Sequence, residues 1–264
     1  MTRRIQRSAD YEITYQIKRD EFIPAPRDSQ RNWLLNRAIK ESADELDHLH
    51  ELSKSFVRGA DPEMGLPDRT NSALADHDIM EDWQVPIMQA MAKVATAGHG
   101  DVLEIGFGRG VGSDFIQAGG VRSHSIIECN ESVIARFEHW RQKYVDQDIR
   151  LVPGLWQNVI DSLGLFDGIF FHTYPLNETE FVELVVQSAT FAEHFFSVAA
   201  RHLKPGGVFT YLTNESDSLS RSHQRALFQH FQSFTLSRVE QLEIPDDTRN
   251  AMWADSMVVV GAVK

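Results

Sequence analysis

Residues 101–112 read Asp101-Val-Leu-Glu-Ile-Gly-Phe-Gly-Arg-Gly-Val-Gly112, an apolar run that passes directly into a glycine-rich turn. Such a run is typical of a buried strand in a parallel sheet. A second apolar run ends at Glu128, about 20 residues beyond the turn, which is the distance at which an acid can meet a bound ribose. A strand, a glycine turn and a later acid together favour an adenosine-type cofactor at the carboxyl ends of parallel strands.

The glycine spacing separates two classes of cofactor. A dinucleotide fingerprint that begins at Gly106 needs a further glycine where this chain has Val111. Glycines instead occupy every second position from 106 to 112, and Glu104 precedes the turn. This pattern resembles the first motif of class I S-adenosylmethionine (SAM) methyltransferases. A tight turn that binds nothing is the alternative, and the pairing of Glu104 with Glu128 weighs against it.

Length and composition favour one large α/β domain with an extension. The chain has 264 residues, of which 42% are hydrophobic, and this is ample for a substantial core. Its single cysteine, Cys129, excludes an intramolecular disulfide and fits a cytoplasmic protein. The basic start is not followed by an apolar core, so we expect no secretory signal and interpret it as a solvated terminus. No run reaches the ~20 apolar residues that span a bilayer, so we expect no membrane partner.

The charge balance bears on the class of partner. The net charge is −12, and the Arg and Lys residues are scattered along the chain. Nucleic-acid binding requires a clustered basic face, so we expect a small-molecule substrate and no nucleic acid. We also expect no metal site.

Residues 1–76 form a predicted N-terminal extension. Residues 11–17 alternate apolar and polar side chains, which predicts a strand. Residues 28–58 carry one apolar stripe at helical spacing, which predicts a long helix, and residues 61–76 have the composition of a linker. The extension suits either a lid over the main domain or a surface through which a homodimer forms, and the sequence does not choose between them.

Residues 77–264 form a predicted Rossmann-like methyltransferase domain of the α/β class. Its elements alternate, which implies a mostly parallel, seven-stranded sheet with helices on both faces and an antiparallel edge. Strands are expected near 101–106, 124–128, 149–152, 166–171, 207–213, 234–244 and 256–263. Helices are expected near 78–97, 111–118, 130–144, 156–163, 178–202 and 218–232, with a break at 204–207 that launches a strand.

Several segments together resemble guanidinoacetate N-methyltransferase and its relatives, among them fungal arginine methyltransferases. The resemblance covers roughly residues 77–264. It is carried by Met80-Glu-Asp-Trp83-Gln-Val-Pro-Ile-Met88, Val102-Leu-Glu-Ile-Gly-Phe-Gly108, Ile126-Ile-Glu-Cys-Asn130, Gly154-Leu-Trp156, Phe166-Asp-Gly-Ile169, Thr173-Tyr-Pro175, Leu203-Lys-Pro-Gly-Gly-Val-Phe-Thr-Tyr211 and Pro245-Asp-Asp247.

The resemblance implies SAM as the cofactor, with S-adenosylhomocysteine as its product. The turn after the first strand would wrap the amino-acid part of SAM, Glu128 would bind the ribose, and Leu155 and Trp156 would flank the adenine. Ordinary core packing is the alternative for Trp156. The full set of implied cofactor residues is Glu104, Phe107, Gly108, Arg109, Gly110, Val111, Gly112, Glu128, Cys129, Asn130, Gly154, Leu155 and Trp156.

The acceptor side departs from the family. An aspartate that takes the guanidinium proton is replaced by His172, and a second acid by Gln84. A guanidinium is always charged and needs carboxylates, so we expect an acceptor other than guanidinoacetate. Glu215 could pair with a different cation or be solvated. The remaining candidates for substrate contact are Met80, Trp83, Met88, Tyr174 and Asn214.

His172 has three interpretations. A free imidazole titrates near ~6.5, so it can take a proton from a hydroxyl, amine or ring N–H as that group is methylated. In its charged form it could instead hold a substrate carboxylate, or it could simply fill space. The leading hypothesis is a small-metabolite methyltransferase with an O, N or electron-rich C acceptor and His172 as base. The alternatives are a guanidine methyltransferase with a rearranged pocket, and a non-catalytic SAM-binding module.

Overall fold

The computed structural model describes residues 2–8, 11–16, 69–186, 188–213, 215, 218–245 and 255–264. The chain divides into two units, Met1–Met64 and Gly65–Lys264. The predicted helix at 28–58 lies outside the described residues. The first residues of the predicted linker at 61–76 also lie outside them, whereas residues 69–76 are described and belong to the second unit.

The first unit contains an antiparallel pair of strands. β1 (Thr2–Ser8) pairs with β2 (Tyr11–Gln16), and Ile5 lies opposite Ile13. The strand expected at 11–17 is therefore confirmed. Its partner β1 covers the basic start, where no strand was expected.

The second unit contains a seven-stranded sheet in the order β5-β4-β3-β6-β7-β9-β8. The strands from β5 to β7 are parallel, and β9 runs antiparallel to both of its neighbours. This confirms the predicted Rossmann-like class I methyltransferase fold, with the antiparallel strand next to the edge strand β8. The strands are β3 (Asp101–Ile105), β4 (Ser123–Glu128), β5 (Ile149–Pro153), β6 (Phe166–Phe171), β7 (Leu203–Thr213), β8 (Ser233–Val239) and β9 (Met257–Val263).

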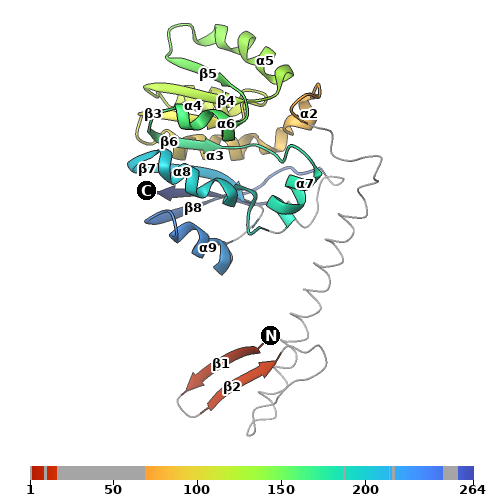
Figure 1. The fold of residues 1–264 in the computed structure, drawn as a ribbon, viewed down its shortest axis with the longest axis vertical. Coiled ribbons are helices and arrows are strands. Elements are labelled where there is room, and N and C mark those ends of the chain that lie inside the picture. The colour runs from red at the N-terminus through yellow and green to blue at the C-terminus, as the bar shows by residue number, and fades with distance from the viewer. Residues whose placement is uncertain are drawn as a thin grey trace. The chain divides into compact units, whose positions relative to one another are not determined.

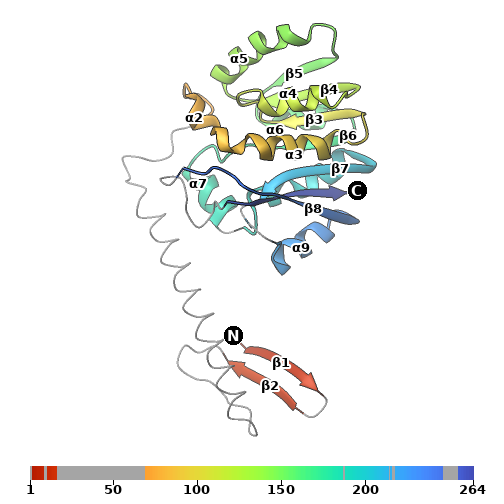
Figure 2. The same ribbon diagram turned by 180° about the vertical axis from the view of Figure 1, so that it is seen from behind.

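Helices cover both faces of the sheet. α8 and α9 lie on the face turned toward the viewer in Figure 1, and α3 lies on the opposite face, which Figure 2 shows from behind. The helices are α2 (Asp76–Ile79), η1 (Asp82–Gln84), α3 (Val85–Ala95), α4 (Val111–Ala118), α5 (Glu131–Arg141), η2 (Gln142–Tyr144), α6 (Trp156–Val159), η3 (Ile160–Ser162), α7 (Glu178–Phe181), η4 (Val182–Val186), η5 (Phe191–Phe195), α8 (Phe196–His202) and α9 (Arg221–Phe228). None of the helices among the described residues has the length and hydropathy needed to cross a bilayer.

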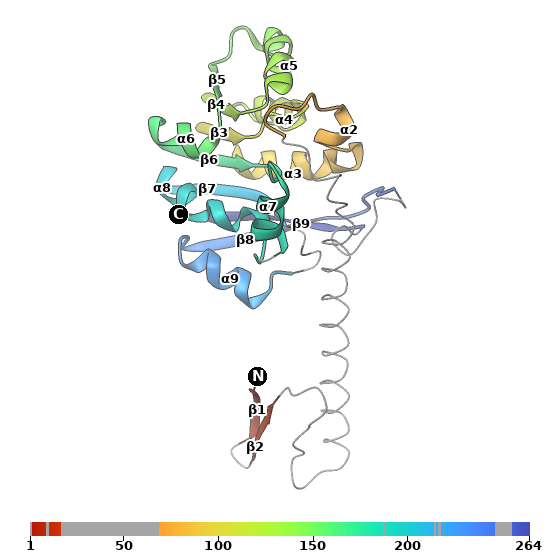
Figure 3. The ribbon, with the colours of Figure 1, turned by 45° about the vertical axis from the view of Figure 1, so that its right-hand side comes forward.

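Alternate side chains of each strand enter two separate cores. On β3, Leu103 packs with the phenylalanines of η5 and α8, whereas Val102 packs with α3 and α4. Both side chains are fully buried. The central strands are therefore held between two apolar layers, with helices on both sides of the sheet (Figure 3), whereas the edge strand β8 is largely exposed.

Several predicted elements differ from the structure. The helix expected at 78–97 is interrupted, because Met80 and Glu81 are extended, and the strand expected at 234–244 ends at Val239. The helix expected at 178–202 is divided, because Thr190 is extended (φ −155°, ψ 150°) and begins a new helical turn. Glu193 stabilises that start by accepting a hydrogen bond from the Ala189 N–H at 3.1 Å. The strand expected from residue 207 begins at Leu203, because Leu203 already pairs with Phe166 across a bulge. The predicted break at 204–207 is therefore an irregularity within β7.

Candidate active site

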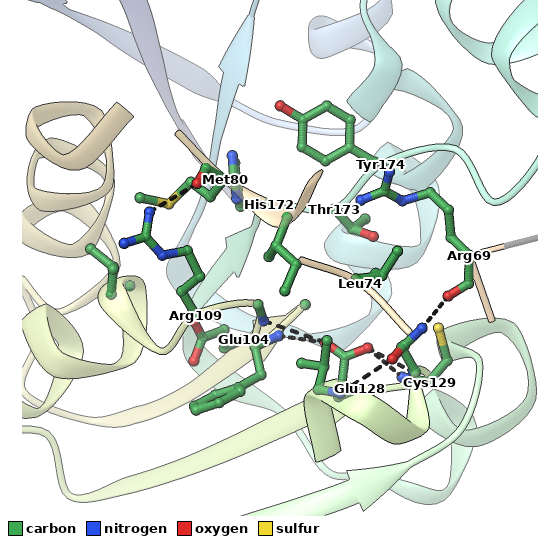
Figure 4. A pocket seen from close by; sticks show the side chains of 18 of the residues that line it. Arg69, Leu74, Met80, Glu104, Arg109, Glu128, Cys129, His172, Thr173 and Tyr174 are labelled. Carbon is green, nitrogen blue, oxygen red and sulfur yellow. Dashed lines mark hydrogen bonds between the residues drawn. The ribbon is translucent and has the colours of Figure 1, made fainter. Parts of the chain in front are cut away.

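The carboxyl ends of β3, β4 and β6 surround a cavity with about 660 Å³ of empty space (Figure 4). A second cavity of about 420 Å³ adjoins it and shares Gly106, Glu128 and Cys129 with it. The first cavity brings together the predicted residues Met80, Met88, Glu104, Phe107, Gly108, Arg109, Val111, Gly112, Glu128, Cys129, Asn130, His172 and Tyr174. The second is lined by the predicted residues Gly154, Leu155 and Trp156.

Gly106 joins the turn after β3 to the end of β6. Its φ is +89°, and a Cβ atom there would lie 2.4 Å from the carbonyl oxygen of His172. The His172 N–H in turn donates to the carbonyl of Ile105 at 3.2 Å. Only glycine permits both this dihedral and this approach. The backbone of the turn and the backbone that carries His172 are therefore in direct contact.

Glu128 is a buried carboxylate held by the backbone. One oxygen accepts hydrogen bonds from the N–H groups of Cys129 at 2.8 Å and Asn130 at 2.9 Å. The other accepts from Phe107 at 3.0 Å and, more weakly, from Gly108 at 3.5 Å. The weak fourth bond leaves accepting capacity on that oxygen for a ligand hydroxyl. The position suits the predicted contact with a ribose.

Glu104 lies deeper in the same cavity and is 1% exposed. It accepts a hydrogen bond from the Ser113 hydroxyl at 2.5 Å, and His124 Nε2 lies 3.0 Å from it. The Gln117 amide contacts His124 Nδ1 at 2.9 Å, which leaves Nε2 as the nitrogen that carries the proton, although Nε2 lies near Glu104 without a hydrogen bond to it. Sequence reasoning missed His124 and Gln117. The one available signal was a histidine within an apolar strand.

His172 lines the cavity directly after β6 and is half-buried. Desolvation lowers its pKa to about 4, so the imidazole is neutral at pH 7. Its ring meets the Tyr174 ring edge-on, with 5.9 Å between centroids. A neutral imidazole can accept a proton from an acceptor. The interpretation in which charged His172 holds a carboxylate requires that the bound carboxylate raise this pKa, and it stays a prediction.

Trp83 and Gln84 lie behind the cavity and not on it. Trp83 is 8% exposed and donates its indole N–H to Glu81, while Gln84 is 2% exposed. The Gln84 amide oxygen accepts the Glu81 N–H at 3.1 Å, and its nitrogen donates to the Tyr174 hydroxyl at 3.2 Å. Neither residue lines the two cavities described above, so their predicted contact with the substrate stays a prediction. In the structure the Gln84 side chain supports Tyr174.

Glu215 is also turned away from the cavity. Its carboxylate lies 2.7 Å from His223 Nδ1 and accepts the Ser220 N–H at 3.0 Å. The other nitrogen of His223 lies 2.6 Å from the Tyr211 hydroxyl in the core. These bonds occupy the carboxylate that was considered for pairing with a cationic substrate. Asn214, the neighbouring candidate, lies outside the described residues.

Two of the predicted cofactor residues use their side chains in contacts within the protein. The Phe107 ring is buried against Phe137 and Trp140, with centroids 5.4 and 5.3 Å away, so its backbone faces the cavity. Asn130 caps helix α5, because its side-chain oxygen accepts the N–H groups of Ser132 and Val133. Neither side chain is free to contact an adenine or an amino-acid tail.

Residues 69–76, which we call the strap, border the first cavity. The Asn130 side-chain amide donates to the carbonyls of Arg69 and, at 2.8 Å, of Ser72. Arg136 Nη2 donates to the Leu74 carbonyl at 2.8 Å. Arg69 and Leu74 both line the cavity. The strap was missed by sequence reasoning, which assigned these residues to a linker.

Replacement of Asn130 by alanine is expected to lower the free energy of unfolding by about 1–2 kcal/mol, the usual value of a helix N-cap. The bonds to the strap add to this loss, since they leave with the same side chain. Urea denaturation measures the effect. Asn158→Ala, an exposed position on α6, is the matched control, and equal midpoints for the two variants would contradict the assigned role.

Several known proteins are similar to this chain in sequence. The model of the guanidinoacetate N-methyltransferase family matches residues 51–251. Protein arginine N-methyltransferase 2 from Eremothecium gossypii is 29% identical over 144 residues, which are 50% of this chain and 32% of that protein. The protein of the same name from Candida glabrata is 25% identical over 186 residues, 64% of this chain and 42% of that protein. The chain therefore spans less than half the length of these curated relatives.

Solved structures are similar in fold. A precorrin-6y C5,15-methyltransferase from Geobacter metallireducens superposes with a TM-score of 0.48 and 16% identity, over 73% of this chain and 94% of that one. A spermidine synthase from Thermotoga maritima superposes with a TM-score of 0.46 and 16% identity, over 68% of this chain and 59% of that one.

Proposed function

Because the chain belongs to the guanidinoacetate N-methyltransferase family, we propose that it is a SAM-dependent methyltransferase for a small acceptor other than guanidinoacetate. Neutral His172 takes the acceptor's proton. The observation that carries this proposal is the position of His172, which follows β6 and lines the same cavity as Glu128 and the glycine turn.

The residues around the cavity suit the proposed cofactor. Glu128 is buried yet retains accepting capacity for ribose hydroxyls, and the turn after β3 brings backbone close to the ligand. Leu155 and Trp156 offer apolar surface for the adenine in the adjoining cavity. When bound, SAM supplies a methyl group on a positively charged sulfonium.

The lowered pKa of His172 limits the chemical classes of acceptor for which His172 can act as the base. A base with a pKa of about 4 efficiently removes only a proton that becomes strongly acidic during the reaction. A hydroxyl or an aromatic ring N–H becomes strongly acidic when it attacks the methyl group. An aliphatic amine becomes an ammonium that keeps its proton at pH 7. We therefore infer an oxygen acceptor or an aromatic nitrogen acceptor.

The groups next to His172 favour an acceptor without a guanidinium. The His172 imidazole is neutral, and its ring neighbour is Tyr174. The two acids of the lining, Glu104 and Glu128, already accept hydrogen bonds from protein donors. A guanidinium at His172 would therefore lack the carboxylate that the family places there, which is unfavourable for a desolvated cation.

Methylation of an arginine-type guanidine is the second candidate function. It is favoured by the relatives named protein arginine N-methyltransferase 2. In this case a guanidine would bind in a pocket rearranged around Gln84 and Glu215, whose carboxylate would have to leave His223.

A turnover panel distinguishes these functions. Formation of S-adenosylhomocysteine is measured with phenols and indoles in one set, and with guanidinoacetate, arginine and an arginine-containing peptide in the other. We expect turnover only in the first set. Turnover confined to the guanidines would establish the second candidate. SAM binding by calorimetry without turnover of any acceptor would indicate a non-catalytic binding module.

A further inference from the structure

We infer that Arg69 and Tyr174 form a subsite for a carboxylate group on the acceptor. This inference rests on the proposed function, because it concerns the acceptor side of the same cavity. It adds a chemical class: the acceptor is an aromatic or heteroaromatic acid whose carboxylate lies against Arg69 while its nucleophile faces His172.

The first observation is the geometry of Arg69. Its guanidinium carbon lies 5.6 Å from the centroid of the Tyr174 ring, within the range of a cation–π contact. The Tyr174 ring is in turn 5.9 Å from the His172 ring. All three side chains line the first cavity, and Figure 4 shows Arg69 beside Tyr174. The Arg69 guanidinium thus contacts Tyr174, whose ring also contacts the imidazole of the proposed base, His172.

The second observation concerns hydrogen-bond donors. Arg69 Nη2 donates to the carbonyl of Asp78 at 2.5 Å. This fixes one corner of the guanidinium, and Tyr174 faces its plane. A guanidinium carries five N–H donors in one plane, and a carboxylate takes two of them side by side. The other N–H groups of the Arg69 guanidinium make no hydrogen bond to the described residues and are available to a carboxylate.

The third observation is the balance of charge. Arg109, the other arginine on this cavity, is already paired with Asp82 at 2.8 Å and bonded to the Met80 carbonyl at 2.9 Å. Among the described residues, Arg69 has no carboxylate within ion-pair distance. Glu104 and Glu128 accept hydrogen bonds from neutral donors of their own. Arg69 is therefore a cation of this lining without a carboxylate partner among the described residues, and a carboxylate on the acceptor can pair with it.

The backbone of Arg69 is held by hydrogen bonds that do not involve the Arg69 side chain. The Arg69 carbonyl accepts a hydrogen bond from Asn130, and its N–H donates to the Leu176 carbonyl at 3.2 Å. The backbone is anchored on both sides, so a change of the side chain can remove the proposed subsite while the strap stays bound. This makes Arg69 suitable for a test by substitution.

Matched pairs of probes test the subsite directly. Binding of 4-hydroxybenzoate is compared with that of 4-hydroxybenzamide, and indole-3-acetate with indole-3-acetamide, by calorimetry at low salt. Each pair is measured on the protein alone and on the protein saturated with S-adenosylhomocysteine. At least one acid is expected to bind about tenfold or more tightly than its amide.

Substitutions assign the preference to Arg69. Arg69→Gln is expected to remove the preference for the acid and to leave the affinity for the amide within about threefold. Arg69→Lys keeps the positive charge but loses the paired N–H donors of the guanidinium, so it is expected to retain part of the preference for the acid. Arg225→Gln, an exposed position on α9, is the control and should behave as the wild type. Circular dichroism melting confirms that the variants are folded.

Two outcomes would overturn the inference: no acid binds more tightly than its amide, or the preference survives in Arg69→Gln. Failure of the proposed function is recognised separately. In that case S-adenosylhomocysteine does not bind, yet the probes still report on Arg69 in the protein alone.

Discussion

Replacement of His172 by alanine is expected to lower kcat for methyl transfer by about 100- to 10,000-fold, the usual contribution of a positioned base. The affinity for SAM is expected to change by less than about threefold, because His172 lies across the cavity from Glu128 and shares no hydrogen bond with it. Single-turnover formation of S-adenosylhomocysteine measures the first quantity, and calorimetry the second. His139→Ala, an exposed histidine on α5, is the control.

The pH dependence gives this prediction a second readout. Desolvation holds the pKa of His172 at about 4, so wild-type kcat/KM is expected to be flat for this group from pH 6 to 8 and to fall near pH 4. The fall should be absent in His172→Ala. The same shift affects stability. The stabilisation from neutral His172 is fully present above the unfolded value of ~6.5, and it is lost as the pH falls from there toward 4. Unchanged kcat in the variant would refute the role of base.

Replacement of Glu128 by glutamine is expected to weaken SAM binding by about 100-fold and to lower the free energy of unfolding by about 1–3 kcal/mol. Four backbone N–H groups converge on this carboxylate. An amide offers them one oxygen, and its NH₂ group then opposes the remaining donors. A hydrogen bond to a charged group is worth more than one to a neutral group, so the ribose contact weakens as well.

Calorimetry and urea denaturation measure the two effects of Glu128→Gln. Glu138→Gln on α5 removes the same charge from an exposed position, and it is expected to change neither. Glu128→Asp keeps the charge but shortens the side chain, and an intermediate loss is expected. If Glu128→Gln binds SAM as tightly as the wild type, the cofactor does not contact this carboxylate.

The cofactor side of the cavity was predictable because its signals are local. A buried strand, its glycine turn and Glu128 are recognised within 28 residues of sequence, and parallel strands bring their ends together by geometry. The same is true of His172, which follows directly after an apolar strand. The backbone contact between Gly106 and His172, in contrast, joins residues 66 positions apart and depends on which strands become neighbours.

The acceptor side was harder to predict because its contacts join distant residues. Asn130 bonds to Arg69 across 61 positions, and Gln84 to Tyr174 across 90. No periodicity encodes such pairs. The position of Gln84 in its motif suggested a direct contact with the substrate, whereas its side chain is buried behind Tyr174. The motif match therefore indicated the region in which Gln84 lies, whereas the partner of its side chain depends on the fold.

The tight approach of Gly106 to the His172 carbonyl has a consequence for protein engineering. The turn after β3 and the segment that carries His172 are in direct backbone contact, so insertions or backbone shifts in one segment will displace the other. Altered acceptor preference should therefore be sought through side-chain exchanges around Arg69 and Tyr174, and not through remodelling of either loop.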